Sequence, residues 1–140
     1  MCARLFVATA LSLLGLGITN AEVLSESSKD LGFGFRQVHR EQTNPSGSFE
    51  RIGHFAFLYY KDTNLSQTTI YSIAPSVKYA LFQDGPTGNI VLFISLSVQK
   101  KVVAKFAGSL ATQFKWDEGK KAATVTFANG QTSRVPLNEP

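Results

Sequence analysis

Cysteine is almost absent from this sequence, in which Cys2 is the only one. Residues 22–140 can therefore form no disulfide, and thiolate chemistry or thiolate ligation of a metal is excluded there. A small secreted domain relies on disulfides when its hydrophobic core is too small to stabilise it. A stretch of this length can bury a core of its own, so we expect a domain held together by packing.

Histidine is also scarce, since only His39 and His54 occur. The chain contains no HExxH, CxxC or GxSxG pattern, which are the usual sequence marks of zinc hydrolases, dithiol sites and serine hydrolases. Most carboxylates fall in turn sequences or in the polar stretch before residue 51, where they favour solubility and turn formation. We therefore expect no catalytic residues, no metal site and no cofactor, and the protein is predicted not to be an enzyme.

Charge of one sign is not concentrated in this chain. Lys and Arg total 14, Asp and Glu total 10, and the formal net charge is +4. A dedicated nucleic-acid-binding protein carries a dense basic stripe, so we expect no nucleic-acid partner. The mild excess of positive charge favours solubility and weak attraction to anionic surfaces.

No apolar run is long enough to span a bilayer, which takes about 20 residues. The longest run, LFVATALSLLGLGI at 5–18, follows the basic Arg4 and precedes the small Ala21. A basic start, an apolar centre and small residues at the cleavage point are typical of a secretory signal peptide. We therefore predict a signal peptide at 1–21 that is cleaved before Glu22, a secreted, extracellular protein, and no transmembrane segment.

One N-glycosylation sequon is present, Asn64-Leu65-Ser66, because the proline in Asn44-Pro45-Ser46 excludes the other candidate. In a secreted chain such a sequon is glycosylated on a surface loop. Asn64 is therefore the predicted glycan site, and the mature protein is predicted to be a glycoprotein.

The sequence has many short runs typical of β-strands. From residue 51 onward, apolar and polar residues alternate over short runs between turn residues, and no run repeats its apolar residues at helical spacing. About seven or eight such runs predict an all-β fold, an antiparallel sandwich or barrel, in a single β domain at 51–140. The stretch 22–50 is polar and interrupted by glycine and proline, so we expect a flexible N-terminal arm there.

The stretch 83–89, QDGPTGN, lies between two alternating runs. Gly, Pro and Asn are the residues that a tight reversal needs, so we predict a structural turn whose remaining functional use is contact with a protein partner. We expect the strand that follows to occupy 89–98 and to reverse in a three-residue loop at 99–101, or through a bulge. Only an odd loop at that point keeps the apolar residues of both strands on one face.

The densest basic region contains Lys100, Lys101 and Lys105. Together with Asp84 and Thr87 of the predicted turn, these lysines form a candidate contact surface for an unknown protein partner or an extracellular surface. An alternative role for the lysines is protection of exposed strand edges against unwanted pairing.

Aromatic side chains crowd the strands between residues 54 and 82. They are candidates either for the core or for the lining of a cavity that holds a small apolar ligand. The five candidates are Phe55, Phe57, Tyr59, Tyr71 and Tyr79. Core packing is favoured, because aromatic residues supply much of the buried area of a domain.

The stretch 79–108 resembles the multiprotein bridging factor 2 (transcription activator) family, which consists of small insect proteins with signal peptides. The positions that carry the resemblance are Tyr79, Ala80, Gly85, Pro86, Asn89, Val91, Leu92 and Ser97. The chain departs from the family pattern in a shorter segment before this stretch, in Ala107-Gly108 where the family has Tyr-Gly, and in the extension 110–140. The family name implies a transcriptional coactivator, although many members look like secreted proteins, and no catalytic residues carry over.

These observations favour one function and leave two alternatives. The favoured one is a secreted, non-enzymatic β protein that binds a partner protein or an extracellular surface. The alternatives are a carrier of a small apolar ligand, which the aromatic residues favour, and a transcriptional coactivator, which only the family resemblance implies.

Overall fold

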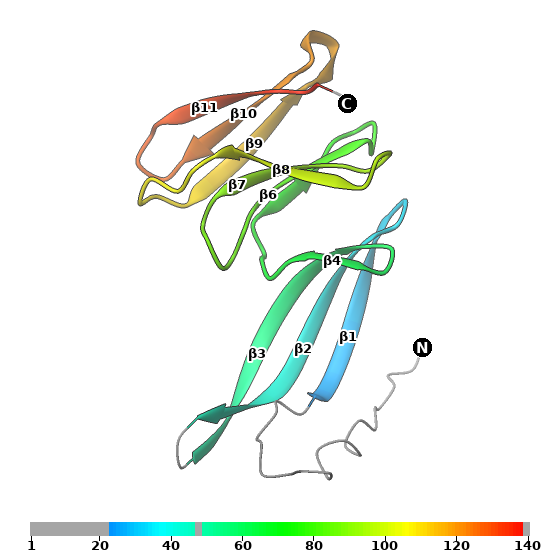
Figure 1. Cartoon of the computed structure of the whole chain (residues 1–140), viewed down its shortest axis with the longest axis vertical. Helices are drawn as coiled ribbons and strands as arrows, with labels where there is room; N and C mark the ends of the chain where they lie inside the picture. The colour runs from blue at the N-terminus through cyan, green and yellow to red at the C-terminus, as the bar shows by residue number, and fades with distance from the viewer. Residues whose placement is uncertain (1–22, 47–48, 139–140) are drawn as a thin grey trace. The chain divides into compact units, whose positions relative to one another are not determined.

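The computed structural model describes residues 23–46 and 49–138, and the predicted signal peptide lies outside them. The described part of the chain forms the strands β1 (Val23–Gly32), β2 (Phe35–Ser46), β3 (Phe49–Tyr60), β4 (Thr63–Ser66), β5 (Tyr71–Ile73), β6 (Tyr79–Gln83), β7 (Ile90–Ile94), β8 (Gln99–Ala104), β9 (Ala111–Asp117), β10 (Ala122–Phe127) and β11 (Thr132–Pro136), with one 3-10 helix, η1 (Glu118–Lys120). Figure 1 shows this succession of strands. No helix among the described residues has the length and apolar character needed to cross a membrane.

The strands form three antiparallel sheets, which confirms the all-β prediction. Their strand orders are β1-β2-β3-β4, β5-β6-β7-β8 and β11-β10-β9. None of these sheets closes on itself within the described residues, so the barrel alternative is wrong. The eleven strands outnumber the predicted seven or eight, and two of them, β1 and β2, lie in the polar N-terminal region.

The chain divides into two compact units, the first ending at Leu65 and the second beginning at Ser66. The predicted boundary between an arm and a single domain at 51–140 is therefore wrong. That boundary falls inside β3, which pairs along its whole length with β2. Because a β-ladder ties together the two strands that it joins, residues on both sides of position 50 belong to the same sheet.

The described residues of the stretch 22–50 lie in β-strands and in the turn that joins two of them, so the prediction of a flexible arm is also wrong. Its described residues form β1 and β2, an antiparallel hairpin whose turn contains Phe33. Within that turn the Asp30 carboxylate accepts a hydrogen bond of 2.8 Å from the Gly32 amide. The hairpin therefore has its own turn chemistry, in which an Asp side chain binds the backbone two residues further on.

Polar composition was misleading here because cross-strand pairs stabilise a sheet alongside apolar burial. Arg40 on β2 pairs with Glu26 on β1 at 2.8 Å between Nε and the carboxylate. The same guanidinium lies 4.7 Å from the ring centre of Phe57 on β3. One arginine thus links three strands by an ion pair and a cation–π contact.

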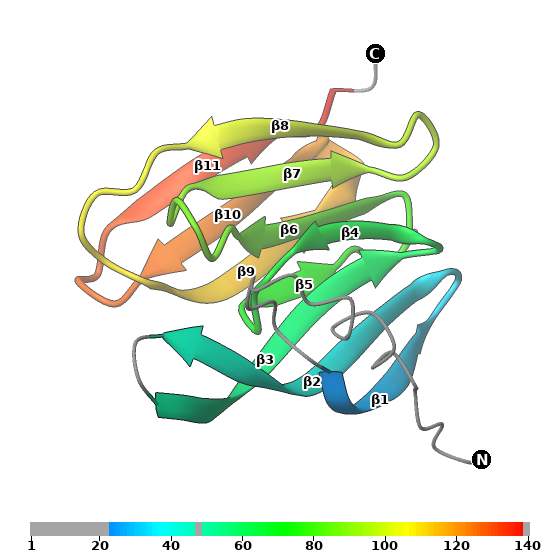
Figure 2. The same ribbon diagram turned by 60° about the horizontal axis from the view of Figure 1, so that its bottom comes forward.

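The second unit is a sandwich of two sheets, β5 to β8 and β9 to β11, which are seen one over the other in Figure 2. Apolar side chains from both sheets pack together and form one cluster. Its buried members are Ala74, Tyr79, Leu81, Ile90, Leu92, Ile94, Ala111, Ala123, Val125, Val135 and Leu137. The sandwich alternative is therefore confirmed for this unit.

A buried polar side chain, that of Gln83 at the end of β6, links the two sheets of the sandwich. Its amide nitrogen donates a hydrogen bond of 2.8 Å to the carbonyl of Gly88, and its amide oxygen accepts one of 2.8 Å from the Ala111 amide at the start of β9. Gln83 is only 3% exposed. Since both ends of its amide are paired, the side chain satisfies two backbone groups that packing alone would leave unpaired.

The hairpin of β7 and β8 differs from its prediction. β7 ends at Ile94, which pairs with Gln99, so the reversal occupies 95–98 and the loop predicted at 99–101 is part of β8. Sequence alternation continued through Leu96 and Val98, but both side chains are exposed. The chain turns at 95–98 instead of continuing the strand, because the Ser95 amide and hydroxyl both donate to the carbonyl of Lys78, at 2.9 and 3.2 Å.

Candidate functional site

The turn between β6 and β7 is held by its own polar groups, and the prediction of a structural turn is confirmed. Both carboxylate oxygens of Asp84 accept hydrogen bonds, from the Ser66 hydroxyl at 2.6 Å and the Thr87 hydroxyl at 2.7 Å. The Asn89 amide donates to the Thr87 hydroxyl oxygen at 3.1 Å. Asp84 and Thr87 thus have a structural use, and their contact with a partner stays a prediction.

This network changes the acidity of Asp84. Burial by itself raises the pKa of the carboxyl, but the hydrogen bonds from Ser66 and Thr87 and the positive charge of Lys100 outweigh it. The pKa of Asp84 is therefore held below its ordinary value. A carboxylate with these partners is stabilised in its charged form, and its role here is to hold the turn together.

Gly85 allows the turn to approach the chain that follows β4. A Cβ at this position would overlap the carbonyl oxygen of Gln67. The amide of Gly85 also donates to the Ser66 hydroxyl at 3.1 Å. The glycine is therefore required by close backbone contact, as expected where two backbone segments approach one another.

The three candidate lysines lie on and beside β8, the edge strand of its sheet, and all three are exposed. Lys100 pairs with Phe93 and Lys101 with Leu92, so these two side chains project from opposite faces of the sheet. Lys105 follows the end of β8. The lysines therefore border one edge without sharing a face, an arrangement that also protects the edge from pairing.

Beside these lysines, the turn at 95–98 presents two apolar side chains to solvent. Leu96 is 81% exposed and Val98 is 52% exposed. Val98 has φ 51°, in the left-handed region, where a β-branched residue costs roughly 1–2 kcal/mol. Glycine or asparagine would occupy this position without that cost. The turn thus exposes an apolar side chain at position 98, where the backbone conformation favours glycine or asparagine.

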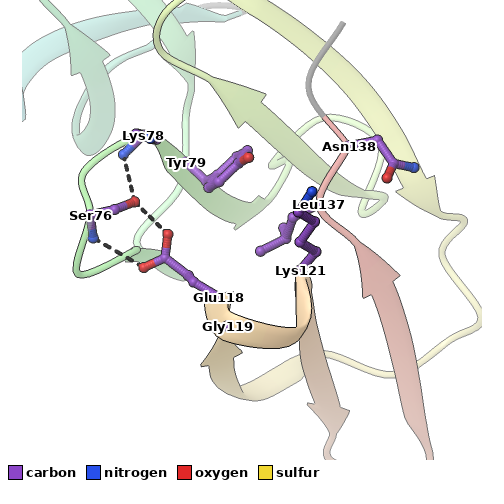
Figure 3. A pocket seen from close by; sticks show the side chains of 8 residues that line it. All are labelled: Ser76, Lys78, Tyr79, Glu118, Gly119, Lys121, Leu137 and Asn138. Carbon is purple, nitrogen blue, oxygen red and sulfur yellow. Dashed lines mark hydrogen bonds between the residues drawn. The ribbon is translucent and has the colours of Figure 1, made fainter.

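A half-open pocket of about 680 Å³ lies at one end of the sandwich, and Figure 3 shows its lining. The lining side chains come from the turn before β6, from the start of β6, from the η1 turn and from the chain after β11. They are Ser76, Lys78, Tyr79, Glu118, Gly119, Lys121, Leu137 and Asn138. Its inner wall is apolar, because Tyr79 and Leu137 are buried members of the core cluster.

Glu118 and Ser76 join the two sheets at the rim of this pocket. The carboxylate of Glu118 accepts hydrogen bonds from the Ser76 amide at 3.1 Å and from the Ser76 hydroxyl. The same hydroxyl oxygen accepts a bond of 3.2 Å from the Lys78 amide (Figure 3). One carboxylate therefore fixes the turn before β6 against η1, and both of its oxygens are occupied.

Two residues at the pocket have left-handed backbone conformations although they are not glycine. Val77, between the lining residues Ser76 and Lys78, has φ 58°, and Lys121 has φ 53°. Hydrogen bonds hold both: the Val77 amide donates to Ala74 at 2.8 Å, and the Lys121 amide donates to Glu118 at 3.0 Å. Such strained residues gather at ligand-binding and active sites more often than elsewhere.

No sequence pattern predicts this pocket, because its two main contributors, Ser76 and Glu118, are 42 residues apart and each lies in a turn sequence. Pro75-Ser76 and Asp117-Glu118-Gly119 carry ordinary turn residues. Nothing in a single sequence indicates that these turns meet. The only available signal was the isolated pair Lys120-Lys121 beside a turn carboxylate.

The five candidate aromatic residues are divided between the two units. Phe55, Phe57 and Tyr59 lie on β3 in the first unit, whereas Tyr71 and Tyr79 lie in the second. A guanidinium covers the ring of Tyr59, with Arg36 at 4.6 Å from its centre. Tyr79 belongs to the core cluster. The expectation of core packing is therefore met for Tyr79, and the three residues of β3 lie on a sheet face that carries arginines.

Asn64 is exposed on β4, which is compatible with a glycan at that position. The third residue of the sequon, Ser66, is buried and hydrogen-bonded to Asp84 at 2.6 Å. Glycosylation of Asn64 stays a prediction from the sequence.

Among the described residues, no three His, Cys, Asp or Glu side chains gather in a group that could hold a metal ion. Comparison of the chain with protein-family models, with curated proteins and with solved structures gives no match.

Proposed function

We propose that this protein is a secreted, non-enzymatic β protein that binds a partner protein through the turn 95–98. The observation that carries the proposal is the exposure of Leu96 and Val98 on a turn whose backbone favours glycine or asparagine at position 98. Valine is strained at position 98, where asparagine or glycine would not be. A strained residue at such a position suggests that its side chain has a function.

The proposed contact is small and apolar at its centre. Burial of a leucine or valine side chain against a partner contributes about 1.5–3 kcal/mol when it is complete. Residues of this kind act as anchors when they fill pockets on a partner and exclude water around them. Leu96 and Val98 are close in sequence and lie on one short turn, so a single pocket or groove on the partner can take both.

The neighbouring lysines determine which partners approach fastest. Lys100 and Lys101 follow the turn after one residue, Gln99, and are exposed. Charges at the rim of a contact accelerate association with an oppositely charged partner and contribute less to the final affinity. We therefore propose a partner with an acidic surface around an apolar pocket, and its association rate is expected to fall as salt is raised.

The proposal is tested by capture from the extracellular fluid of the producing organism, with the wild-type chain and a double variant, Leu96→Ser with Val98→Asn. The matched control is Leu110→Ser, because Leu110 is 56% exposed and lies outside the turn. We expect a protein that wild type and control retain and that the double variant loses. Equal capture by all three chains would refute the proposed site.

A further inference from the structure

The pocket in Figure 3 combines an apolar inner wall with a basic rim. Tyr79 and Leu137 supply the wall, with 6% and 2% exposure, while Lys78 and Lys121 lie at the rim. In the part of the chain that the structure describes, no ion pair includes either of these two lysines. The rim therefore offers two ammonium groups to a ligand.

Among the described residues, a single carboxylate lines the pocket, and it does not cancel this charge completely. Glu118 contributes one negative charge against the two lysines, and its two oxygens accept the Ser76 amide and hydroxyl. These two bonds use two of the roughly four lone-pair sites of the carboxylate within the protein. The lining thus keeps a net charge of one positive unit, contributed by Lys78 and Lys121 against Glu118.

Hydrogen bonds fix the backbone on both sides of the pocket. Val77 and Lys121 keep left-handed conformations, and the Leu137 amide donates to the Lys121 carbonyl at 2.9 Å. The Ser95 hydroxyl donates to the Val77 carbonyl at 3.1 Å, which fixes the other side. The backbone of the lining is therefore fixed before a ligand binds, whereas the exposed lysine side chains still lose rotamer freedom on binding.

We propose that this pocket binds a small organic anion, with a carboxylate or phosphate head at Lys78 and Lys121 and a short apolar body against Tyr79 and Leu137. The volume of about 680 Å³ falls within the range of small-molecule sites, roughly 300–1,000 Å³. This ligand site shares no lining residue with the proposed partner contact, because no residue of the turn 95–98 lines the pocket.

The test is a titration of the full, isotope-labelled chain followed by amide NMR, with hexanoate, hexyl phosphate, hexylamine and inorganic phosphate as probes. Hexanoate or hexyl phosphate is expected to shift the amides of Ser76, Gly119 and Asn138 in a saturable way. Whichever of the two binds more tightly identifies the head group. Hexylamine and inorganic phosphate are expected to bind about tenfold more weakly, because each lacks one of the two features.

Variants assign the binding to the two lysines. Lys78→Gln and Lys121→Gln are each expected to weaken binding about fivefold, as for one partly exposed charge pair. The control is Lys115→Gln, since Lys115 is exposed on β9 and does not line the pocket. Amide spectra of each variant report whether it is folded.

Three results would overturn the proposal: no saturable shift at the lining amides, hexylamine binding as tightly as hexanoate, or the Lys115 variant losing as much affinity as the pocket variants. Inorganic phosphate that binds as tightly as hexyl phosphate would refute the apolar part of the site. Failure of these tests leaves the proposed contact at 95–98 untouched, because its test measures a different surface.

Discussion

At the scale of single residues, Val98 combines an unfavourable backbone conformation with an exposed side chain. Replacement of Val98 by Asn is expected to raise the free energy of unfolding by about 1 kcal/mol, because asparagine tolerates the left-handed region. Chemical denaturation of wild type and variant measures the change.

The control for that experiment is Val102→Asn, because Val102 has the same 52% exposure but lies in β8 with a backbone that is not left-handed. Loss of a β-branched residue from a strand is expected to lower stability there. The explanation by backbone strain fails if both variants change stability in the same direction. A stabilised Val98→Asn protein that no longer captures its partner would show that the valine is retained for binding.

Asp84 makes stability depend on pH. Its pKa is lowered in the folded state, so the charged carboxylate favours folding at pH values above the ordinary aspartate pKa. As the pH falls below about 4, Asp84 is protonated first in the unfolded chain. The stabilisation therefore decreases progressively, and it is gone once the carboxyl is protonated in the folded protein as well. Acidification is therefore expected to lower the stability of the wild type more than that of Asp84→Asn, which has no carboxylate at this position.

The measurement is the free energy of unfolding of both proteins between pH 7 and pH 2. The difference between wild type and Asp84→Asn should shrink as the pH falls through that range. A difference that is constant with pH would mean that the hydrogen bonds from Ser66 and Thr87 do not favour the charged carboxylate.

At the scale of strands and sheets, Gln83 joins the two layers of the sandwich through Gly88 and Ala111. Gln83→Leu keeps a similar volume but leaves the Ala111 amide without its acceptor. The expected loss is about 2 kcal/mol, the usual cost of an unpaired buried polar group.

Thermal and chemical denaturation measure that loss, and Gln113→Leu is the control because Gln113 is exposed on β9. A surface substitution of this kind is expected to change stability by no more than about 0.5 kcal/mol. If Gln83→Leu costs as little as the control, the buried amide does not hold the sheets together.

At the scale of the whole molecule, the prediction of a secreted glycoprotein concerns the chain as its cells release it. Intact mass measurement is expected to show a mature protein that begins at Glu22 and loses mass when N-glycans are removed enzymatically. Asn64→Gln should abolish that loss without unfolding the protein, because Asn64 is exposed. Ser66→Ala should also abolish it but should lower stability, because the Ser66 hydroxyl binds Asp84.

An intracellular chain that still contains residues 1–21 would contradict the secretory prediction. A secreted chain of unmodified mass would contradict only the glycan. The two outcomes are therefore separable in one experiment.

The sequence by itself determined the all-β class and the turn at 84–89, because alternation and turn residues act over a few neighbouring positions. It failed for 22–50, where the Arg40 contacts with Glu26 and Phe57 replace apolar alternation as the sign of a strand. It also failed at 95–98, where hydrogen bonds to a residue 17 positions away decide the turn.

Only the tertiary structure brought Ser76 and Glu118 together and so produced a pocket with two lysines at its rim. The physical reason is range: strand periodicity is encoded between neighbours, whereas contacts between distant turns depend on how the sheets pack. The all-β class of the protein can thus be predicted from short stretches of its sequence. Its candidate binding sites depend on contacts between residues that are far apart in the sequence.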